Sequence, residues 1–431
     1  MRFTSLNEWL AWQERLHSAE IDLGLERVSR VLHAMGLGKT PFKVITVAGT
    51  NGKGSSVAML ESVLIAAGYR TGAYYSPHLI RYNERVRIDG QEVSDQLLCR
   101  AFDHVDTARA QIPLTYFEFG TLAALQIFFA AELDVVVLEV GLGGRLDAVN
   151  IMDCDAALIT GIGLDHREWL GDDRERIGYE KAGIMRPSRP AVCSDPTPPL
   201  SLSAHAADLG APLACLGRDY GYTVQGDNWS WRGASRRRTA LPWPALRGGI
   251  QLQNAAGVLM TLEQLCVDLP VTQGQIRDGL LSVSLGGRLQ VLPGTPTRIL
   301  DVAHNPHAAA ELVKALESMP CHGQTHAVFA MLKDKDIAGV AREMSNAVDV
   351  WHAASLAVGR GASSGQLAAL LGEGGGRAVH EYADPQAAYA AAHRACDAGD
   401  RIVVFGSFYT VAAILKLENH PALTNTSAVQ V

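Results

Sequence analysis

The stretch Gly49-Thr50-Asn51-Gly52-Lys53-Gly54-Ser55-Ser56 lies between a short β-branched segment, residues 43–47, and a segment typical of a helix, residues 55–67. A strand that runs into a glycine-rich turn and then a helix lets backbone N–H groups and the helix dipole hold phosphate oxygens. Lys53 would then reach the terminal phosphates. The order of strand, Gly-Lys and helix therefore predicts a nucleotide-binding P-loop rather than a simple turn with an exposed lysine.

This loop departs from the usual P-loop pattern at the position that normally binds magnesium. Gly54 stands where a Ser or Thr hydroxyl would ligate Mg²⁺, so another residue must do so. Three segments that follow predicted strands offer ligands: residues 76–79, 138–144 and 163–166. Because the carboxyl ends of parallel strands meet at one crevice, we expect these segments to lie near the P-loop. Each segment taken alone would also fit a helix cap or a loop contact.

Strand-like and helix-like segments alternate along the chain, which predicts an α/β fold with parallel sheets. The apolar runs 134–138 and 156–160 suit strands buried on both faces, and residues 120–131 suit a helix. The pattern restarts near residue 290. We therefore expect a P-loop domain over residues 1–287, with a β-rich extension at about 196–250, and a smaller Rossmann-like α/β domain over residues 288–431. The second domain has these expected elements: a turn at 292–296, strands near 298–302, 326–331, 348–353 and 401–405, and a helix at 306–316.

The composition argues against several classes of protein. The net charge of −7, from 38 basic and 45 acidic residues, does not favour a non-specific nucleic-acid binder. The seven cysteines form no C-x-x-C pair, so neither a disulfide framework nor a zinc ribbon is expected. No signal peptide is expected, because Glu8 and Glu14 come before any long apolar run, and no apolar run is long enough to span a bilayer. A cytoplasmic protein without a membrane or nucleic-acid partner is expected.

Several spaced motifs, in order and over nearly the whole chain, resemble the dihydrofolate synthase/folylpolyglutamate synthase family of the Mur ligase superfamily. One departure is Val149, where the family usually has Thr. The motifs that carry the resemblance are residues 23–27, 50–55 and 138–150, Asp165-His166, residues 180–184 and 301–306, and residues 405–409.

The resemblance implies a Mur-ligase-like P-loop domain followed by a glutamate-ligase domain, and an ATP-dependent reaction. The γ-phosphoryl group of ATP would pass to a carboxylate, and the amine of L-glutamate would attack the acyl phosphate to form an amide. The carboxylate would belong to 7,8-dihydropteroate in one activity and to the glutamyl tail of a reduced folate in the other. Phosphoryl transfer needs positioning and charge neutralisation, which a lysine and Mg²⁺ supply. The resemblance further implies two Mg²⁺ ions and a monomer.

The same resemblance implies a role for individual residues. Lys181 would be carbamylated, which turns a cation into an anion that can bind or orient metal ions, whereas from its position alone it would be an exposed helix lysine. The implied groups are ATP-binding Asn51, Gly52, Lys53, Gly54, Asn254, Arg288 and Asp301; metal-binding Ser76, Glu139 and His166; substrate-binding Thr115, Tyr116, Phe117, Glu118, Leu146, Asp147, Ala148 and Ser407; and catalytic Lys53, Lys181 and His304.

Structural roles remain the alternative for several of these residues. Phe117 would fit a core, Asn254 a polar position on a helix, Arg288 a hinge salt bridge, and His304 the start of a helix. A peptidoglycan-precursor ligase of the Mur type is the alternative enzyme, but such enzymes usually carry a UDP-binding domain before the P-loop, and only 48 residues precede Gly49. A non-catalytic nucleotide-binding regulator would not need the metal and acceptor residues.

Overall fold

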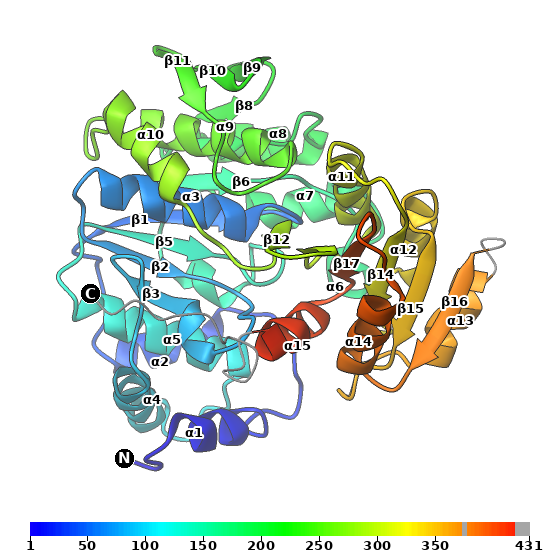
Figure 1. The fold of residues 1–431 in the computed structure, drawn as a ribbon. Helices are drawn as coiled ribbons and strands as arrows, with labels where there is room; N and C mark the ends of the chain where they lie inside the picture. Colours follow the sequence, from blue (N-terminus) through cyan, green and yellow to red (C-terminus); the bar gives the residue numbers. More distant parts are fainter. Residues whose placement is uncertain (373–376, 419–431) are drawn as a thin grey trace, which may run out of the picture. The chain divides into compact units, whose positions relative to one another are not determined.

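Two compact units make up the protein (Figure 1). The structure, a computed structural model, describes residues 1–372 and 377–418. The N-terminal unit consists of Met1–His78, Tyr82–Ala245 and Ile250–Ser284, and the C-terminal unit of Leu79–Arg81, Leu246–Gly249 and the residues from Leu285 onward. Each unit is built on a sheet of mostly parallel strands.

The N-terminal unit contains an eight-stranded sheet in the order β4-β3-β2-β5-β1-β6-β7-β8. All neighbouring strands are parallel except the pairs β2-β3 and β3-β4. From β1 the chain goes to β2, β3 and β4 on one side, and it later adds β6, β7 and β8 on the other side. The direction of strand order therefore changes beside β1, and folds of this kind bind ligands at such a point. The strands are β1 (Lys43–Ala48), β2 (Thr71–Tyr74), β3 (Val86–Ile88), β4 (Gln91–Glu92), β5 (Val135–Glu139), β6 (Ala156–Ile159), β7 (Ala191–Cys193) and β8 (Leu213–Cys215).

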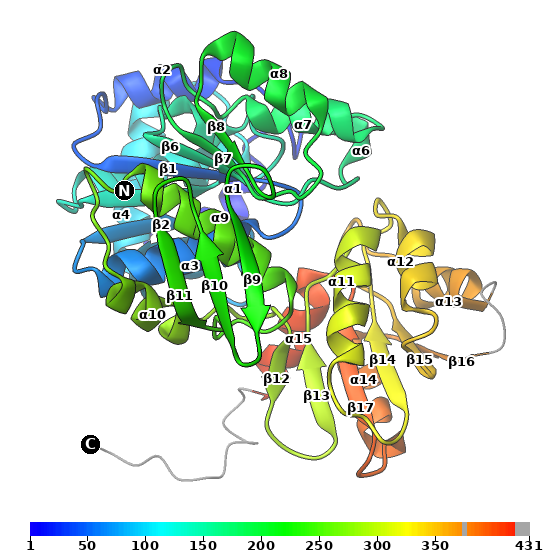
Figure 2. The same ribbon diagram turned by 90° about the horizontal axis from the view of Figure 1, so that it is seen from above.

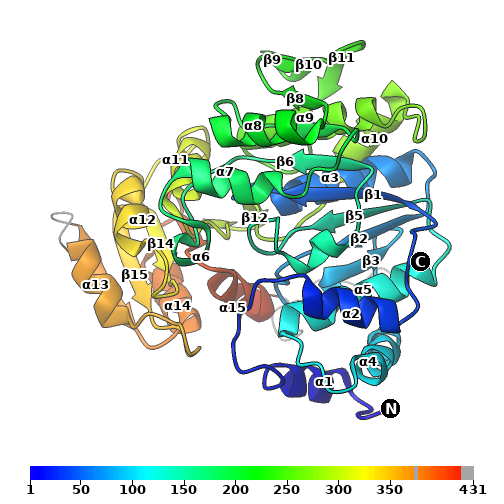
Figure 3. The same ribbon diagram turned by 180° about the vertical axis from the view of Figure 1, so that it is seen from behind.

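Helices cover both faces of this sheet (Figures 1 and 3). One face carries α3 (Lys53–Ala66), α9 (Ile250–Gln264) and α10 (Gln273–Ser282), and the other carries α1 (Leu6–Gln13), α2 (Glu26–Ala34), α4 (Asp95–Arg109) and α5 (Tyr116–Phe129). Between β6 and β8 lie α6 (Arg167–Leu170), α7 (Arg174–Ala182) and α8 (Leu200–Leu209), with α7 packed against α8 (Figure 3). Two 3₁₀ helices, η1 (Tyr82–Arg85) and η2 (Ala148–Ile151), complete the unit.

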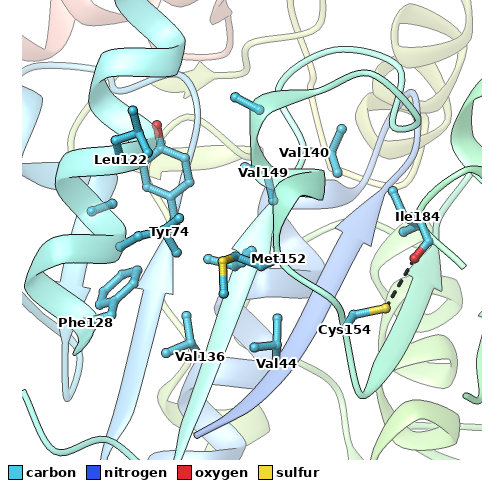
Figure 4. Packing of buried hydrophobic residues seen from close by; sticks show 14 of the residues in the cluster. Val44, Tyr74, Leu122, Phe128, Val136, Val140, Val149, Met152, Cys154 and Ile184 are labelled. Carbon is cyan, nitrogen blue, oxygen red and sulfur yellow. Dashed lines mark hydrogen bonds between the residues drawn. The ribbon is translucent and has the colours of Figure 1, made fainter. Parts of the chain in front are cut away.

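The core under α5 joins the sheet to the segment after β5 (Figure 4). Val44 and Val136 from the central strands and Leu122 from α5 are fully buried. Met152, which follows η2, lies in the same cluster, so burial of apolar side chains fixes the segment 140–152 against the sheet. This segment carries several of the site residues.

A small antiparallel sheet, in the order β11-β10-β9, belongs to the same unit (Figure 2). Its strands are β9 (Gly221–Gln225), β10 (Asn228–Arg232) and β11 (Arg237–Pro242). Trp231 is buried, and its Nε1 donates a hydrogen bond of 3.1 Å to the carbonyl of Ala256 in α9. The small sheet therefore supports α9, the helix that carries Asn254.

The C-terminal unit contains a six-stranded sheet in the order β12-β13-β17-β14-β15-β16, in which only β12 and β13 are antiparallel. The expected turn at 292–296 is confirmed as the β12-β13 hairpin loop. The strands are β12 (Gln290–Leu292), β13 (Thr297–Leu300), β14 (Thr325–Phe329), β15 (Val350–Ala354), β16 (Ala378–Tyr382) and β17 (Arg401–Phe405). One apolar cluster packs three helices on one face of this sheet: α11 (Pro306–Glu317), α12 (Ile337–Met344) and α13 (Ser364–Gly372). A second apolar cluster packs two helices on the other face: α14 (Pro385–Ala395) and α15 (Phe408–Glu418).

The mixed α/β class expected from the sequence is confirmed. No helix within the described part of the chain combines the length and the apolar character that a bilayer-spanning helix needs.

Candidate active site

The glycine-rich loop after β1 is held in place by the loop that follows β6. The Thr50 hydroxyl donates to the Gly163 carbonyl and accepts from the Gly163 N–H, each at 3.0 Å. Thr160 Oγ1 donates to the Asn51 carbonyl at 2.7 Å. Gly52 has a φ of +92°, and a Cβ there would clash with Asn254 Oδ1, so only glycine fits. The structure thus brings the predicted P-loop residues and Asn254 together.

Lys53 starts α3 and turns back along the P-loop. Its Nζ donates to the carbonyl oxygens of Gly49 and Thr50, at 3.0 and 3.2 Å. Gly54, the next residue, is a helical residue with no side chain to crowd the loop. This arrangement puts a cation at the amino end of a helix, as phosphate binding requires.

Two of the three predicted metal ligands are in direct contact. Glu139, the last residue of β5, is only 4% exposed, and its Oε2 accepts a hydrogen bond of 3.1 Å from the Ser76 N–H. His166 is the N-cap of α6 and has a φ of +50°, and its N–H donates to Oδ1 of the preceding Asp165 at 2.8 Å. A buried carboxylate beside a hydroxyl residue is a donor set that suits Mg²⁺, whereas the imidazole of His166 is a less usual ligand for this ion.

Lys181 is not an exposed helix lysine but a buried residue, 2% exposed, near the end of α7. Burial, and then the positive charge of Lys53, lower the pKa of the Lys181 amine to about 7, against the opposing effect of Asp165 and Asp147. These effects place Lys181 within electrostatic reach of the P-loop lysine and of two acidic site residues. A large fraction of this amine is neutral near pH 7.

Backbone contacts that only glycine permits position Lys181. A Cβ on Gly144 would lie 2.7 Å from the Glu180 carbonyl oxygen and 3.1 Å from the Lys181 Cα. The Arg145 N–H donates to the same Glu180 carbonyl at 2.8 Å. Asn150 Nδ2 donates to the carbonyls of Arg145 and Gly183, each at 3.0 Å. The loop after β5 is thereby fastened to the end of α7.

Asp147 organises the loop that contains it. Its Oδ2 accepts from the Leu142 N–H at 2.8 Å and its Oδ1 from the Val149 N–H at 3.0 Å. Burial raises the pKa of Asp147 to about 6, although these N–H groups and Lys53 favour its charged form. Ala148 is buried beside it, and Leu146 is half-buried.

Thr115 and Glu118 form the capping box of α5. The Thr115 N–H donates to Glu118 Oε2 at 2.8 Å, and Arg27 donates to Glu118 Oε1 at 3.0 Å. Both carboxylate oxygens of Glu118 therefore already have protein partners. Phe117 is half-buried, and its ring lies against Gly141, where a Cβ would come within 2.7 Å of Phe117 Cζ. Tyr116 lies under the Arg85 guanidinium, 5.7 Å from ring centre to Cζ.

The C-terminal unit brings two further predicted residues, Arg288 and His304, to the Phe408 ring, and a third, Asp301, within electrostatic reach of Arg288. Arg288 Cζ lies 5.2 Å from the centre of the Phe408 ring, and the His304 ring lies 6.1 Å from it. Asp301 accepts from the Leu289 and Ala303 N–H groups, each at 2.8 Å. Burial raises the pKa of Asp301, while the charge of Arg288 opposes this.

Ser407 has a different environment from these three. It is 4% exposed, and its Oγ accepts from the Thr410 N–H at 3.0 Å at the start of α15. Thr160 and Phe408 have contacts at the site that the sequence did not single out. Thr160 directly follows β6, and its position at the carboxyl end of a strand is the feature of the sequence that could have predicted its contact with the P-loop.

Comparisons with known proteins identify the family of this chain. A family model described as Mur ligase, glutamate ligase domain, matches residues 287–408. The dihydrofolate synthase/folylpolyglutamate synthase of Escherichia coli (strain K12) is 46% identical over 412 residues, 96% of this chain and 95% of that protein. The chain belongs to the dihydrofolate synthase/folylpolyglutamate synthase family. The protein of the same name from Haemophilus influenzae is 40% identical and covers 94% of this chain, with 96% of its own length matched.

Solved structures of this family have the same fold. Escherichia coli FolC in complex with DHPP and ADP has a TM-score of 0.91 and 46% identity, covering 96% of this chain and 97% of that one. A bifunctional folylpolyglutamate synthase/dihydrofolate synthase from Yersinia pestis, complexed with AMPPNP and Mn ion, has a TM-score of 0.90 and 47% identity, with coverages of 97% and 98%. The fold class and the family expected from the sequence are confirmed, and the chain is an ATP-dependent ligase of the Mur type rather than a non-catalytic regulator.

Proposed function

We propose that this ligase adds L-glutamate to 7,8-dihydropteroate and to the glutamyl tail of reduced folates, through an acyl phosphate. The observation that carries the proposal is that Lys53 follows β1, Glu139 ends the neighbouring strand β5, and the buried Lys181 lies within electrostatic reach of Lys53. Support also comes from relatives named for both activities, and from one solved structure bound to Mn, AMPPNP and L-Glutamate. A peptidoglycan-precursor ligase is the less favoured alternative, because the relatives match over nearly the full length of both chains.

The reaction has two chemical steps. A carboxylate oxygen of the pteroate or folate attacks the γ-phosphorus of ATP, and ADP leaves. The amine of L-glutamate then attacks the acyl carbon, phosphate leaves, and the amide forms after loss of a proton from nitrogen. The phosphates would lie on Asn51, Gly52, Lys53 and Gly54, where Lys53 stabilises the charge that develops on the transferred group.

Other predicted residues would hold the ends of the substrates. Asn254 lies at the P-loop, which suits a contact with the nucleotide. In the C-terminal unit, Arg288 and Asp301 are proposed to hold the nucleotide, and His304 and Ser407 to lie near L-glutamate. His304 Nδ1 is 2.8 Å from the Val302 carbonyl oxygen, and this contact orients the imidazole ring.

The pterin would lie against the N-terminal unit. Phe117 offers the face of an aromatic ring, and Asp147 a carboxyl group for the amino-pyrimidine edge. Thr115, Tyr116, Leu146 and Ala148 are proposed to shape the pocket around them. Glu118 is engaged with Thr115 and Arg27, so we propose that it supports Phe117 through the start of α5 and that any substrate contact uses the remaining lone pairs.

The donor atoms at this site suit a divalent metal ion. Ser76, Glu139 and His166 would hold Mg²⁺, which when bound neutralises the charge on the transferred phosphoryl group. We propose two ions. The neutral fraction of the Lys181 amine is the form that reacts with CO₂, so a carbamate at Lys181 would supply the carboxylate that helps to hold a second ion. We further propose that the protein acts as a cytoplasmic monomer.

A product assay tests the proposal. The purified protein with ATP, Mg²⁺ and L-glutamate should convert 7,8-dihydropteroate to dihydrofolate and should lengthen the tail of a reduced folate by one glutamate, as seen by mass spectrometry. UDP-linked muramoyl substrates with their amino acids should give no product. Turnover of the muramoyl substrate alone would reject the proposed function in favour of the peptidoglycan ligase.

A further inference from the structure

A histidine, a cysteine and an aspartate meet in the C-terminal unit. His326 lies near the start of β14, Cys396 directly follows α14, and Asp400 directly precedes β17. One ligand atom of each residue lies within 4.8 Å of those of the other two. We propose that His326, Cys396 and Asp400 bind a zinc ion.

The site lies apart from the predicted substrate residues of this unit. Asp301 follows β13 and Ser407 follows β17, so both are at the carboxyl ends of these parallel strands. His326 and Asp400 are at the amino ends of β14 and β17, which are also parallel. The zinc site is therefore at the amino ends of the strands, opposite to the predicted substrate residues at their carboxyl ends. At this position the ion takes no part in the ligase reaction.

The Nε2 atom of His326 is the strongest indication of a ligand. His326 is 3% exposed, and its Nε2 is buried without a hydrogen-bond partner. The nearest acidic oxygen, Asp400 Oδ2, is 3.8 Å away, which is longer than a hydrogen bond. Burying a polar nitrogen without a partner is costly, and a metal ion between the two residues would provide the partner.

The other ring nitrogen of His326, Nδ1, lies within hydrogen-bonding distance of a second histidine. This atom lies 3.1 Å from His352 Nε2, and His352 Nδ1 lies 3.2 Å from the Tyr382 hydroxyl oxygen. If each imidazole carries its proton on Nδ1, both hydrogen bonds run outward from His326, and the lone pair on its Nε2 faces Cys396 and Asp400. Histidines that bind metals usually donate their other N–H in this way.

Backbone N–H groups orient the carboxylate of Asp400. Its Oδ1 accepts from Gln324 at 2.6 Å and its Oδ2 from Asp397 at 2.7 Å. These bonds fix the carboxylate and leave a further lone pair on each oxygen. Cys396 is only partly buried, so an ion can reach the thiol from solvent.

The donor atoms select the metal. One imidazole nitrogen, one thiolate sulfur and one carboxylate oxygen suit Zn²⁺ and do not suit Mg²⁺. Ligand atoms of tetrahedral zinc lie about 3.3–3.8 Å apart, so the three atoms, now within 4.8 Å of one another, must approach by about 1.5 Å at most. Binding releases the thiol proton of Cys396, and water takes the fourth position. The ion would tie the α14–β17 connection to β14 and so stabilise this unit.

Cobalt titration of the full-length protein tests the proposal. The reduced, chelator-treated protein should bind Co²⁺ with a thiolate-to-cobalt charge-transfer band, and Zn²⁺ should abolish this band and raise the thermal midpoint by several degrees. C396S and H326Q should lose both the band and the zinc-dependent shift. C266S, which removes a cysteine of the N-terminal unit, should behave like the wild type.

The ligase site provides a second control, because its proposed ligands include no thiol. E139Q should keep the charge-transfer band in full. A wild-type protein without the band, a band that survives in C396S, or a band lost in E139Q would each overturn the zinc site. Circular dichroism of the metal-free variants should match that of the wild type, so that a lost charge-transfer band cannot be due to misfolding.

Discussion

Lys53 and Lys181 lie within electrostatic reach of each other in the N-terminal unit, and the charge of Lys53 adds to burial in lowering the pKa of Lys181 to about 7. Two lysine side chains near each other and near two carboxyl groups form a site whose charge state changes within the physiological pH range. Binding of a polyanion would offset the repulsion between them.

The first prediction concerns the pH dependence of stability. An unfolded lysine has a pKa of about 10.4, so between about pH 7 and pH 10 the unfolded chain binds one proton more than the folded chain at Lys181. The free energy of unfolding should therefore rise with pH in this range. In the absence of CO₂, the wild type should gain about 2–3 kcal/mol from pH 7 to pH 9 relative to Lys181→Met.

Urea unfolding of both proteins in degassed buffers measures this difference. Lys39→Met, at an exposed position, is the matched control and should keep the wild-type pH profile. Parallel profiles for the wild type and Lys181→Met would mean that the Lys181 amine does not titrate near pH 7.

The second prediction concerns the P-loop lysine. Lys53→Ala should lower the rate of phosphate release by about 10²–10³-fold, because a positioned charge that stabilises the transferred phosphoryl group is lost. The fold should persist, because the hydrogen bonds from Lys53 Nζ to the carbonyls of Gly49 and Thr50 lie within the P-loop itself. Lys39→Ala makes the same change of charge at the surface. A near wild-type rate for purified Lys53→Ala would contradict the P-loop assignment.

The third prediction concerns the metal. Glu139→Gln keeps the size of the side chain, and its amide oxygen can still accept from the Ser76 N–H, but the charge that Mg²⁺ requires is lost. Activity should fall, and half-maximal activity should need a higher Mg²⁺ concentration. Glu132→Gln, at a residue whose side chain is 92% exposed, should leave the Mg²⁺ titration unchanged. Superimposable curves for all three proteins would exclude Glu139 as a ligand.

The fourth prediction uses two glycines with nearly the same backbone conformation. Gly52 has a φ of +92° with Asn254 against it, and Gly68 has a φ of +89° with no atom near a Cβ. Gly52→Ala should weaken ATP binding about 10- to 100-fold, whereas Gly68→Ala should cost only about 1 kcal/mol of stability. Calorimetric titration with a non-hydrolysable ATP analogue measures the affinity. Equal effects of both changes on ATP binding would show that backbone strain alone, without the Asn254 contact, explains the result.

The parts of the fold that were predictable are those in which local pattern and burial agree. The segment 43–47 is apolar and β-branched, and β1 runs from Lys43 to Ala48 with its side chains almost all buried. Thr71–Tyr74 has the same role in the sheet, yet it contains a glycine and a single β-branched residue. Its place beside β5 depends on long-range pairing, which no short window of sequence reveals.

The candidate site shows the same limit. The motif around Lys53 was recognisable because its order, from strand to glycines to helix, is local. The burial of Lys181 could not be predicted from its helix, which has a polar composition, because that burial depends on Gly144 and Asn150 from a distant loop. Likewise, the N-cap role of Thr115 is visible in the spacing of Thr115 and Glu118, but the ion pair of Glu118 with Arg27 is not.

Transfer of an oxygen-18 label tests the central claim most directly. The protein is supplied with ATP, Mg²⁺, L-glutamate and dihydropteroate labelled with oxygen-18 in its carboxylate. If that carboxylate attacks the γ-phosphorus of ATP, one labelled oxygen leaves with each phosphate released, and mass spectrometry should find one label per phosphate together with ADP. Phosphate without label, or AMP and pyrophosphate in place of ADP, would contradict the acyl-phosphate mechanism at this P-loop.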